Sequence, residues 1–413
     1  GFFPSLAAGW RISEEQFWKE NENLSFINNL KLKASYGILG NNNIGNYPYQ
    51  SVYSLGQEQN YVFGGVYTQG AAVTTYVDPG LKWERTRTTD VGIETAFFNN
   101  KLTFNASYFY RKTTDVLYKP AASYSSIFGL SVSQVNTGEL ENKGWEFEIG
   151  HQNTIGKFHY HINGNFSIID NKVLTLGMGN VTQNNGMVGN GSDLFIGYPM
   201  QMFYGYKTDG VFLTDDEVGD WYDQTAIAKG SKAGDIRYVD ITGDGKVTPD
   251  DKTFLGSRIP KYTFGLNFGG EYKGFDFSVL LQGVAKVKGM LSVYAGHAFY
   301  QEGNIQKWQM ENCWNVQQDN RYPEYPRLEI MSNAGSNNTL TSDFWGLDAQ
   351  LGYTLPEHIV KKFGSTGMRF YVSLDNPLTF KGYRKGWDPE NTSNNGQYYP
   401  TMSTYTLGLT LKF

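Results

Sequence analysis

Apolar and polar side chains alternate along many segments of the chain, each about ten residues long. The last segment ends on Phe413, and its apolar members at every second position are Tyr405, Leu407, Leu409 and Leu411. The same period of two recurs near residues 3–12, 30–38, 91–97, 101–110, 145–149, 158–168, 264–272, 275–281, 345–353 and 368–374. Successive side chains of a β-strand point to opposite faces, so the pattern predicts an all-β chain with about eleven strands.

The connections between these segments are of two kinds, and the two kinds alternate along the chain. Tight connections rich in turn-forming residues occur at 99–100, 153–156 and 273–274. Long connections run at about 41–83, 112–137, 171–259, 285–339 and 376–400. Short turns at one end and long loops at the other are typical of a transmembrane antiparallel β-barrel, whose turns lie in the periplasm and whose loops lie outside the cell.

The composition agrees with such a barrel and excludes a membrane protein built from helices. Aromatic residues make up 16% of the chain, the mean hydropathy is −0.45, and no stretch approaches the roughly 18 apolar residues of a membrane helix. A soluble β-sandwich or propeller also alternates, but its strands are usually only about five or six residues long. Since single-chain bacterial barrels have even numbers of strands, we expect the missing strands in an N-terminal part of a longer protein.

Charge and residue counts argue against nucleic-acid binding and against catalysis. The formal net charge is −5 and the isoelectric point about 5.7, without a dense basic cluster. Cys313 is the single cysteine and cannot form an internal disulfide, and there are only five histidines to serve as a base for it. His159 and His161 lie two apart on a predicted strand, where a solvated pair on the polar face is favoured over a zinc site. We predict no enzyme.

Several phrases carry a resemblance to a known family. In chain order they include FPSLAAGWRISEE, LKLKASYGILGN, LKWERTRTTDVGIE, ASYFYRKTTDVLY, NTGELENKGWEFEI, AGDIRYVDITGDGKVTPDDKTFLG, YTFGLNFGGEYKGFDFSVLLQGV and LDNPLTF. In order and over essentially the whole chain, these phrases resemble the C-terminal half of the SusC/RagA family of TonB-dependent outer-membrane transporters of Bacteroidetes.

The resemblance implies a 22-stranded barrel in the cell outer membrane with a globular plug inside it, energised through TonB. It also implies a SusD-like surface lipoprotein that closes the mouth as a lid, import of oligosaccharides or peptides, and a dimer of such pairs. This chain has nothing like the family's plug domain or TonB-contacting segment, so it is expected to supply about eleven strands and to need the N-terminal half as a partner. A structural or adhesive outer-membrane barrel and a secreted carbohydrate-binding β-protein remain as alternatives.

One loop motif matches the twelve-residue calcium loop of EF-hand type. It is DITGDGKVTPDD, from Asp240 to Asp251, with Gly245 at the turn. The predicted ligands are side chains of Asp240, Thr242 and Asp244, the Lys246 carbonyl, Thr248 and Asp251. Thr242 is a poorer ligand than Asp or Asn, and Asp251 has a shorter arm than Glu, so an Asx-rich turn without metal is an equal alternative. Either way the motif is expected to stiffen an extracellular loop.

Two further groups of residues are candidates for binding and for assembly. Five residues of one long loop combine rings with a guanidinium that could stack on sugars or hold peptide groups: Trp308, Trp314, Arg321, Tyr322 and Tyr325. The alternative is that these rings pack the loop onto the barrel rim or the lid. In the terminal strand, Tyr405, Leu407, Leu409 and Leu411 are expected to face outer-membrane lipid. Phe413, in the periplasmic aromatic girdle, resembles the signal read by the barrel assembly machinery.

Overall fold

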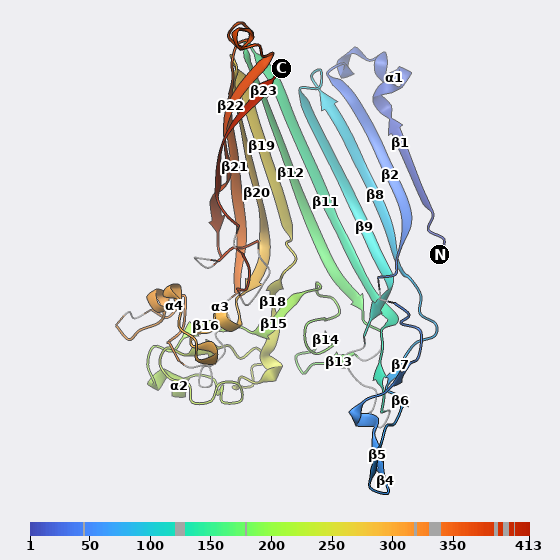
Figure 1. Cartoon of the computed structure of the whole chain (residues 1–413), viewed down its shortest axis with the longest axis vertical. Coiled ribbons are helices and arrows are strands. Elements are labelled where there is room, and N and C mark those ends of the chain that lie inside the picture. The colour runs from blue at the N-terminus through green and yellow to red at the C-terminus, as the bar shows by residue number, and fades with distance from the viewer. Residues whose placement is uncertain are drawn as a thin grey trace.

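The computed structural model describes the chain except residues 44–45, 120–128, 178–179, 318–319, 330–339, 384–386, 391–395 and 400, and describes only the backbone of 57, 340–349, 352, 357 and 363. Its main feature is an eleven-stranded antiparallel sheet in which each strand pairs with the next in the chain (Figure 1). The strands are β1 (Ser5–Arg11), β2 (Ile27–Asn41), β8 (Glu84–Phe97), β9 (Leu102–Tyr118), β11 (Val135–Ile155), β12 (Phe158–Thr175), β19 (Tyr262–Tyr272), β20 (Phe275–Met290), β21 (Leu340–Thr354), β22 (Gly367–Lys381) and β23 (Thr404–Lys412).

The short connections all lie at one end of the sheet. β8 and β9 are joined through Asn99 and Asn100, and β19 and β20 through Lys273 and Gly274, all four with left-handed φ values between 48° and 89°. Such values give a tight turn the twist of the paired strands. The two larger connections at this end contain short helices: η1 (Ile12–Glu14), α1 (Gln16–Lys19) and η2 (Glu22–Leu24), and α5 (Glu357–Val360) and η7 (Lys361–Phe363). The predicted alternation of short turns and long loops is confirmed.

The register of the strands gathers the apolar side chains on one side of the sheet, which we call the apolar face. One row of paired residues crosses six strands and consists of Leu32, Ile93, Ala106, Phe147, Phe166 and Phe264. Along β12 this face runs from Phe158 to Ile168. That length is about 33 Å along the strand and about 25 Å at a tilt near 40°, the height of the apolar band of an outer-membrane barrel. The intervening residues form the polar face.

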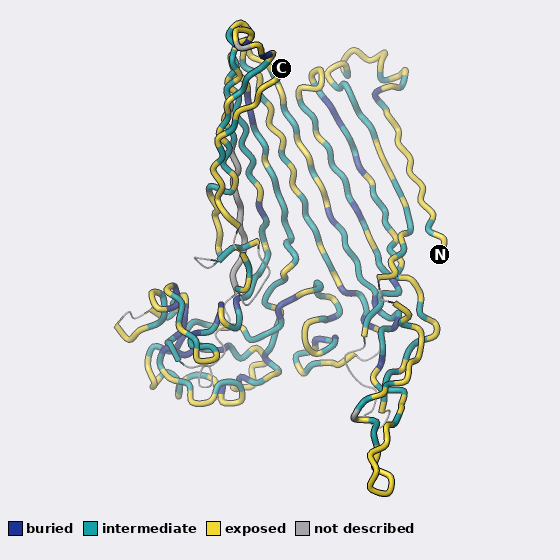
Figure 2. Tube along the Cα trace, in the orientation of Figure 1, coloured by how far each residue is buried: buried dark blue, intermediate teal, exposed yellow. Residues whose placement is uncertain are grey.

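The apolar face is not covered by another layer of the described chain. Trp145 and Leu407 are 47% and 83% exposed, and Figure 2 shows exposed and half-buried residues along most of the sheet. An apolar surface of this size on one side of a sheet needs an apolar surrounding. In the described part of the chain, none of the helices combines the length and apolar character needed to cross a membrane.

The strands continue beyond the segments that alternation predicted. β11 has 21 residues, although the pattern predicted only 145–149, and β9 continues to Tyr118, although a loop was expected from 112. β22 continues to Lys381 instead of ending near residue 374. In the extensions of β9 and β11 the backbone still pairs, but polar side chains occupy both faces, so the sequence carries no apolar period there. In β22 the alternation resumes at Leu378 and Phe380 after a register shift near Asn376, which has a φ of 50°.

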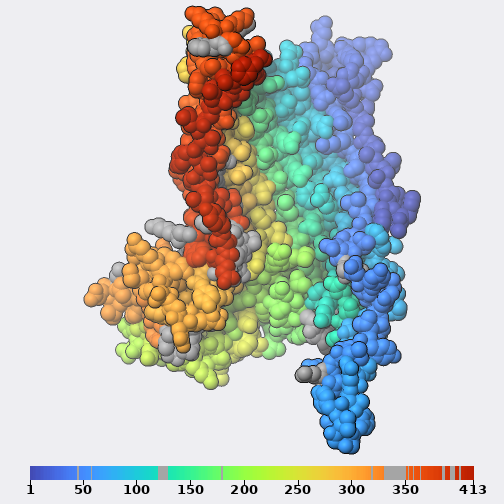
Figure 3. Space-filling view, in the orientation of Figure 1, coloured from blue at the N-terminus to red at the C-terminus, as the bar shows by residue number. Residues whose placement is uncertain are grey.

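The long connections contain their own small sheets and helices. The strands are β3 (Tyr53–Ser54), β4 (Tyr61–Phe63), β5 (Val66–Thr68), β6 (Ala72–Val73), β7 (Thr75–Tyr76), β10 (Ser131–Val132), β13 (Val181–Thr182), β14 (Val188–Gly189), β15 (Met202–Tyr206), β16 (Thr208–Val211), β17 (Ile236–Tyr238) and β18 (Lys252–Ser257). The helices are η3 (Gln57–Gln59), α2 (Asp216–Asp220), η5 (Pro249–Asp251), α3 (Val293–Gly296), η6 (Tyr300–Glu302) and α4 (Lys307–Asn312). The described residues of 200–257 and 291–329 form one continuous mass, here called the loop module, while the β4–β5 hairpin projects separately (Figure 3).

Candidate functional site

The loop module is assembled from two long loops that approach each other closely. The backbone N–H of Val211 donates to the carbonyl of Arg321, and that of Arg327 to the carbonyl of Gly234, both over 2.9 Å. Gly210 and Gly234 have φ values of 72° and 85°, and a Cβ on Gly234 would lie 2.2 Å from the ring of Trp314. Glycine is therefore required where the two backbones meet.

Ion pairs cross the same junction. The Arg327 Nε donates to Asp235 over 2.6 Å, and both side chains are largely buried. Arg321 makes a two-pronged pair with Glu217, with distances of 2.6 and 3.1 Å. The hydrogen bond from Arg321 lowers the pKa of Glu217, with a further contribution from the backbone N–H of Leu213. These fixed charges tie the loops together in a defined orientation.

Two of the predicted substrate-contacting rings form the core of the module. Tyr325 is 1% exposed, and its ring meets that of Trp308 edge to face at 5.5 Å between centroids. The Tyr325 hydroxyl accepts a hydrogen bond from the N–H of Ala298 at 2.9 Å. Leu291 and Ala295 complete this cluster. Trp308 and Tyr325 therefore stabilise the loop in this conformation, and their burial leaves no ring face open to a ligand.

Tyr322 differs from these rings because it points away from the core. Its side chain is 67% exposed, and its hydroxyl donates to Asp209 over 3.0 Å. Arg321 is held by Glu217, and Trp314 packs over Gly234. Of the five residues predicted to contact substrate, Tyr322 offers the most accessible ring, and a binding role for the group stays a prediction.

The predicted calcium loop is closed in the structure by hydrogen bonds to Asp251, which is completely buried. Asp251 Oδ1 accepts the N–H groups of Ile241 and Thr242 at 2.8 and 3.0 Å, and Oδ2 accepts the N–H of Thr248 at 2.7 Å. Burial opposes ionisation of Asp251, but these bonds outweigh it and lower its pKa. Both carboxylate oxygens therefore face donors of the protein itself.

The other acidic residues of this motif are used in the same way. Asp240 accepts the N–H groups of Gly243 and Gly245 at 2.6 and 2.8 Å, and Asp244 accepts that of Lys246 at 2.9 Å. Within the residues that the structure describes, no three His, Cys, Asp or Glu side chains converge as metal ligands. The hydrogen bonds close the motif as an Asx-rich turn, and occupation of this turn by calcium stays a prediction.

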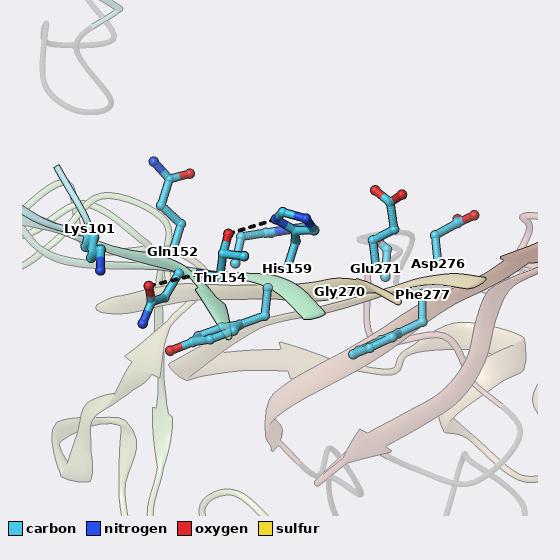
Figure 4. Close-up of a pocket in the computed structure, with 12 residues that line it drawn as sticks. Lys101, Gln152, Thr154, His159, Gly270, Glu271, Asp276 and Phe277 are labelled. Carbon is cyan, nitrogen blue, oxygen red and sulfur yellow. Dashed lines mark hydrogen bonds between the residues drawn. The ribbon is translucent and has the colours of Figure 1, made fainter. Parts of the chain in front are cut away.

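At the opposite end of the sheet, near the tight turns, the polar face forms an open hollow of about 630 Å³. Figure 4 shows His159, Glu271 and Asp276 on the same side of the sheet, with Phe277 on the other. The ring Nδ1 of His159 lies 2.8 Å from the hydroxyl of Thr154. Asp276 pairs with Arg369 of β22 at 2.5 Å. The hollow therefore presents carboxylates and an imidazole together.

Further charged groups on the polar face were not singled out by sequence reasoning. Glu94 lies between Lys31 and Lys33, at 3.2 and 2.9 Å, and Asn105 donates to Glu148 over 3.1 Å. The only sequence signal for these residues is their position at the polar places of the alternating pattern. Which of these charged residues contact each other depends on the register between neighbouring strands, and the sequence does not show that register.

The predicted assembly residues lie on the apolar face of the last strand. Tyr405, Leu407, Leu409 and Leu411 are opposite apolar residues of β22, for example Leu407 opposite Val372. Phe413 follows the strand and is 87% exposed. Their placement agrees with a lipid-facing position, and recognition by an assembly machinery stays a prediction.

Comparison with known proteins gives the same fold from independent information. The family model described as TonB dependent receptor-like, beta-barrel matches residues 1–377. TonB-dependent receptor P3 of Formosa agariphila is 31% identical over the whole chain and 42% of its own length, and SusC of Bacteroides thetaiotaomicron is 27% identical over the whole chain and 40% of its own length.

Two solved structures share the arrangement of strands. They are described as the RagAB peptide importer in the open-open state and the RagAB peptide transporter, with TM-scores of 0.76 and 0.74 and identities of 24% and 22%. Each match covers the whole chain, and 42% and 43% of the solved chains. The chain thus spans less than half the length of the relatives it matches, and it belongs to the β-barrel family of TonB-dependent receptors.

Proposed function

We propose that this chain forms the C-terminal part of the wall of a TonB-dependent importer in the cell outer membrane. The observation that carries the proposal is the exposed apolar face of the eleven-stranded sheet, with tight turns at one end and long loops at the other. Family membership supports it, since the matching family is that of TonB-dependent receptors. The remaining strands, the plug and the contact with TonB belong to the other part of a longer protein.

The polar face is then the inner wall of the barrel. Its charged residues, among them Glu94, Glu148, Glu271 and Asp276, line the path of the solute and contact the plug. The loop module lies at the outer mouth, where a SusD-like lipoprotein would close over it as a lid. The family resemblance implies an oligosaccharide or a peptide as the solute, imported by a dimer of such pairs, and the description of RagAB as a peptide importer supports the peptide.

Uptake by intact cells tests the importer. A strain that lacks the gene of the full-length protein should fail to grow on its solute, and oligosaccharide and peptide mixtures supplied separately identify the class. A lipoprotein should co-purify with the detergent-extracted protein. Normal growth on every mixture, together with reduced attachment to surfaces, would instead support an adhesive barrel. A protein that is monodisperse without detergent would exclude a membrane barrel altogether.

The exposed ring of Tyr322 gives this proposal a residue to test. Tyr322→Ala should weaken solute capture by the full-length importer several-fold without loosening the loop, because the ring packs against no core cluster. Tyr322→Phe is the matched control, since it keeps the ring and removes the bond to Asp209. Equal uptake by wild type and the alanine variant would remove Tyr322 from the binding surface.

We also propose that Phe413 is read during insertion into the outer membrane. Phe413→Ala should reduce the amount of protein in the outer-membrane fraction, whereas Lys412→Ala, one residue earlier on the polar face, should not. Because Phe413 follows the last paired residue of β23, its loss removes no ladder hydrogen bond. Unchanged insertion of the Phe413 variant would show that the terminal ring carries no assembly information.

A further inference from the structure

A cavity of about 480 Å³ opens in the strand wall where β19 stops at Tyr262 while its neighbours continue. β12 reaches Thr175 on one side and β20 reaches Met290 on the other, and residues of β18, which packs against β20, line the space between them. The lining includes Asp170, Phe254, Ile259, Lys261, Lys286 and Lys288. The cavity is thus an opening between strands at the loop end of the sheet.

Three lysines and one carboxylate line this cavity. Lys261 pairs with Asp170 over 2.8 Å. Lys286 and Lys288 make no ion pair within the described residues, and the Lys286 ammonium lies 5.8 Å from the centre of the Tyr262 ring. Lys286 has a φ of 52°, and the β20–β21 ladder is interrupted between Val284 and Lys288. This irregularity turns the lysine out of the regular alternation, toward a ring of the apolar face.

The cavity lies just beyond the apolar band. The last fully apolar row on this side contains Trp145, Ile168 and Tyr262. The next residue of β12 on the same face is Asp170, opposite Lys143. In a membrane, the boundary between the apolar band and water is where lipid headgroups lie. The apolar lining next to the lysines, such as Phe254 and Ile259, adds a surface for the body of a lipid headgroup.

We propose that this cavity binds a phosphate group of an outer-leaflet glycolipid. The excess of ammonium groups over carboxylates is complementary to a phosphate monoester or diester, and basic pockets at the membrane boundary recognise such headgroups through charge. Asp170, which pairs with Lys261 in the lining, lies on the apolar face of β12, so the proposal takes the headgroup to enter from the lipid side. The proposal rests on the outer-membrane location proposed above.

The experiment uses the full-length protein extracted from its own outer membrane in mild detergent. Native mass spectrometry counts phosphorylated glycolipid bound per barrel for wild type and for the double variant Lys286→Asn with Lys288→Gln. Asparagine suits the left-handed backbone at residue 286, so the charge is removed without strain. We expect about tenfold less bound glycolipid in the double variant. Lys157→Gln in the tight turn at the other end is the matched control and should change nothing.

The controls separate this proposal from the location on which it rests. If the wild-type protein is absent from the outer-membrane fraction, the proposed location and the proposed lipid site are both overturned. If it is present and the double variant retains as much glycolipid as wild type, only the lipid site is overturned. Retention of inorganic phosphate without glycolipid would also overturn it, in favour of a soluble anion. Equal thermal unfolding of variant and wild type shows that loss of lipid does not reflect loss of the fold.

Discussion

In the eleven-stranded sheet, side chains as large as Trp145 and Leu407 are exposed, whereas in the loop module Phe212, Val247 and Tyr325 are almost completely buried. The loop module therefore behaves like a small soluble domain, stabilised by its own cores and by ion pairs between its loops. The sheet is stabilised within the chain by backbone pairing and needs an apolar surrounding for its outer side. Truncation of a buried ring should consequently cost most in the loop module, and an added charge should cost most on the apolar face of the sheet.

The largest effect is expected in the core of the loop module. Tyr325→Ala removes a buried ring and the acceptor for Ala298, and should destabilise the module by about 3–5 kcal/mol. Hydrogen exchange of residues 291–329 in the full-length protein measures this. Tyr322→Ala, three residues away and exposed, is the control and should leave exchange unchanged. Similar exchange in both variants would mean that the two rings are equivalent and the module has no core.

The second effect distinguishes the two faces of the wall. Ile162→Arg places a charge on the apolar face near the middle of the band and should cost about 2–4 kcal/mol in a bilayer. His161→Arg, one residue earlier on the polar face, should cost little. Chemical unfolding of the full-length protein in lipid vesicles compares the two. Equal costs would contradict the assignment of faces.

A smaller effect is expected at Asp251. Asp251→Asn keeps the shape but turns an amide donor toward N–H groups, which should cost the loop about 1–3 kcal/mol. Protease cleavage near residues 240–251 measures the loss. The loss should be the same with calcium and with a chelator, since the oxygens already accept hydrogen bonds. Protection that appears only with calcium would instead support a metal site in this loop.

The pH dependence of this loop follows from the same carboxylate. Because the folded pKa of Asp251 lies below the ordinary value of 3.8, ionised Asp251 stabilises the loop above that value. The stabilisation should disappear as the pH falls from 3.8 through the lower folded pKa. Protease protection of the wild-type loop should therefore decline in this acidic range, and the Asp251→Asn variant should lack this part of the decline.

The smallest effect is expected at the half-exposed ion pair between the two loops. Arg321→Gln should cost about 0.5–1 kcal/mol, because water competes for both partners. Combining it with Glu217→Gln gives a double-mutant cycle, in which the second substitution should add little. If the losses of hydrogen-exchange protection in the two single variants add up fully in the double variant, the two side chains are not energetically coupled.

The strands and their faces could be predicted from sequence because each apolar residue in the band must face lipid, and this imposes a period of two. The extension of β11 over residues 135–144 could not be predicted, since strand residues at the loop end, beyond the apolar band, need not alternate between apolar and polar. Contacts such as that of Arg327 with Asp235, which are 92 residues apart, also leave no local pattern.

The candidate sites were harder to interpret because the same residue types serve two purposes. An aromatic ring such as Trp308 packs a loop as well as it stacks on a sugar. Carboxylates spaced as in Asp240, Asp244 and Asp251 accept backbone N–H groups as readily as they bind calcium. Only the surrounding backbone decides between these uses, and it is set by contacts that the sequence does not display.

The tight turns have a consequence for how such a protein can diversify. The turns at Asn99–Asn100 and Lys273–Gly274 fix which residues are opposite each other in their strand pairs, so a single inserted residue there would exchange inside and outside for a whole strand. At the other end, connections can lengthen, shorten or be replaced without disturbing that match. A change of length in the connection between β2 and β8 would therefore alter the loop end of the sheet while every strand keeps the same residues on its apolar and polar faces.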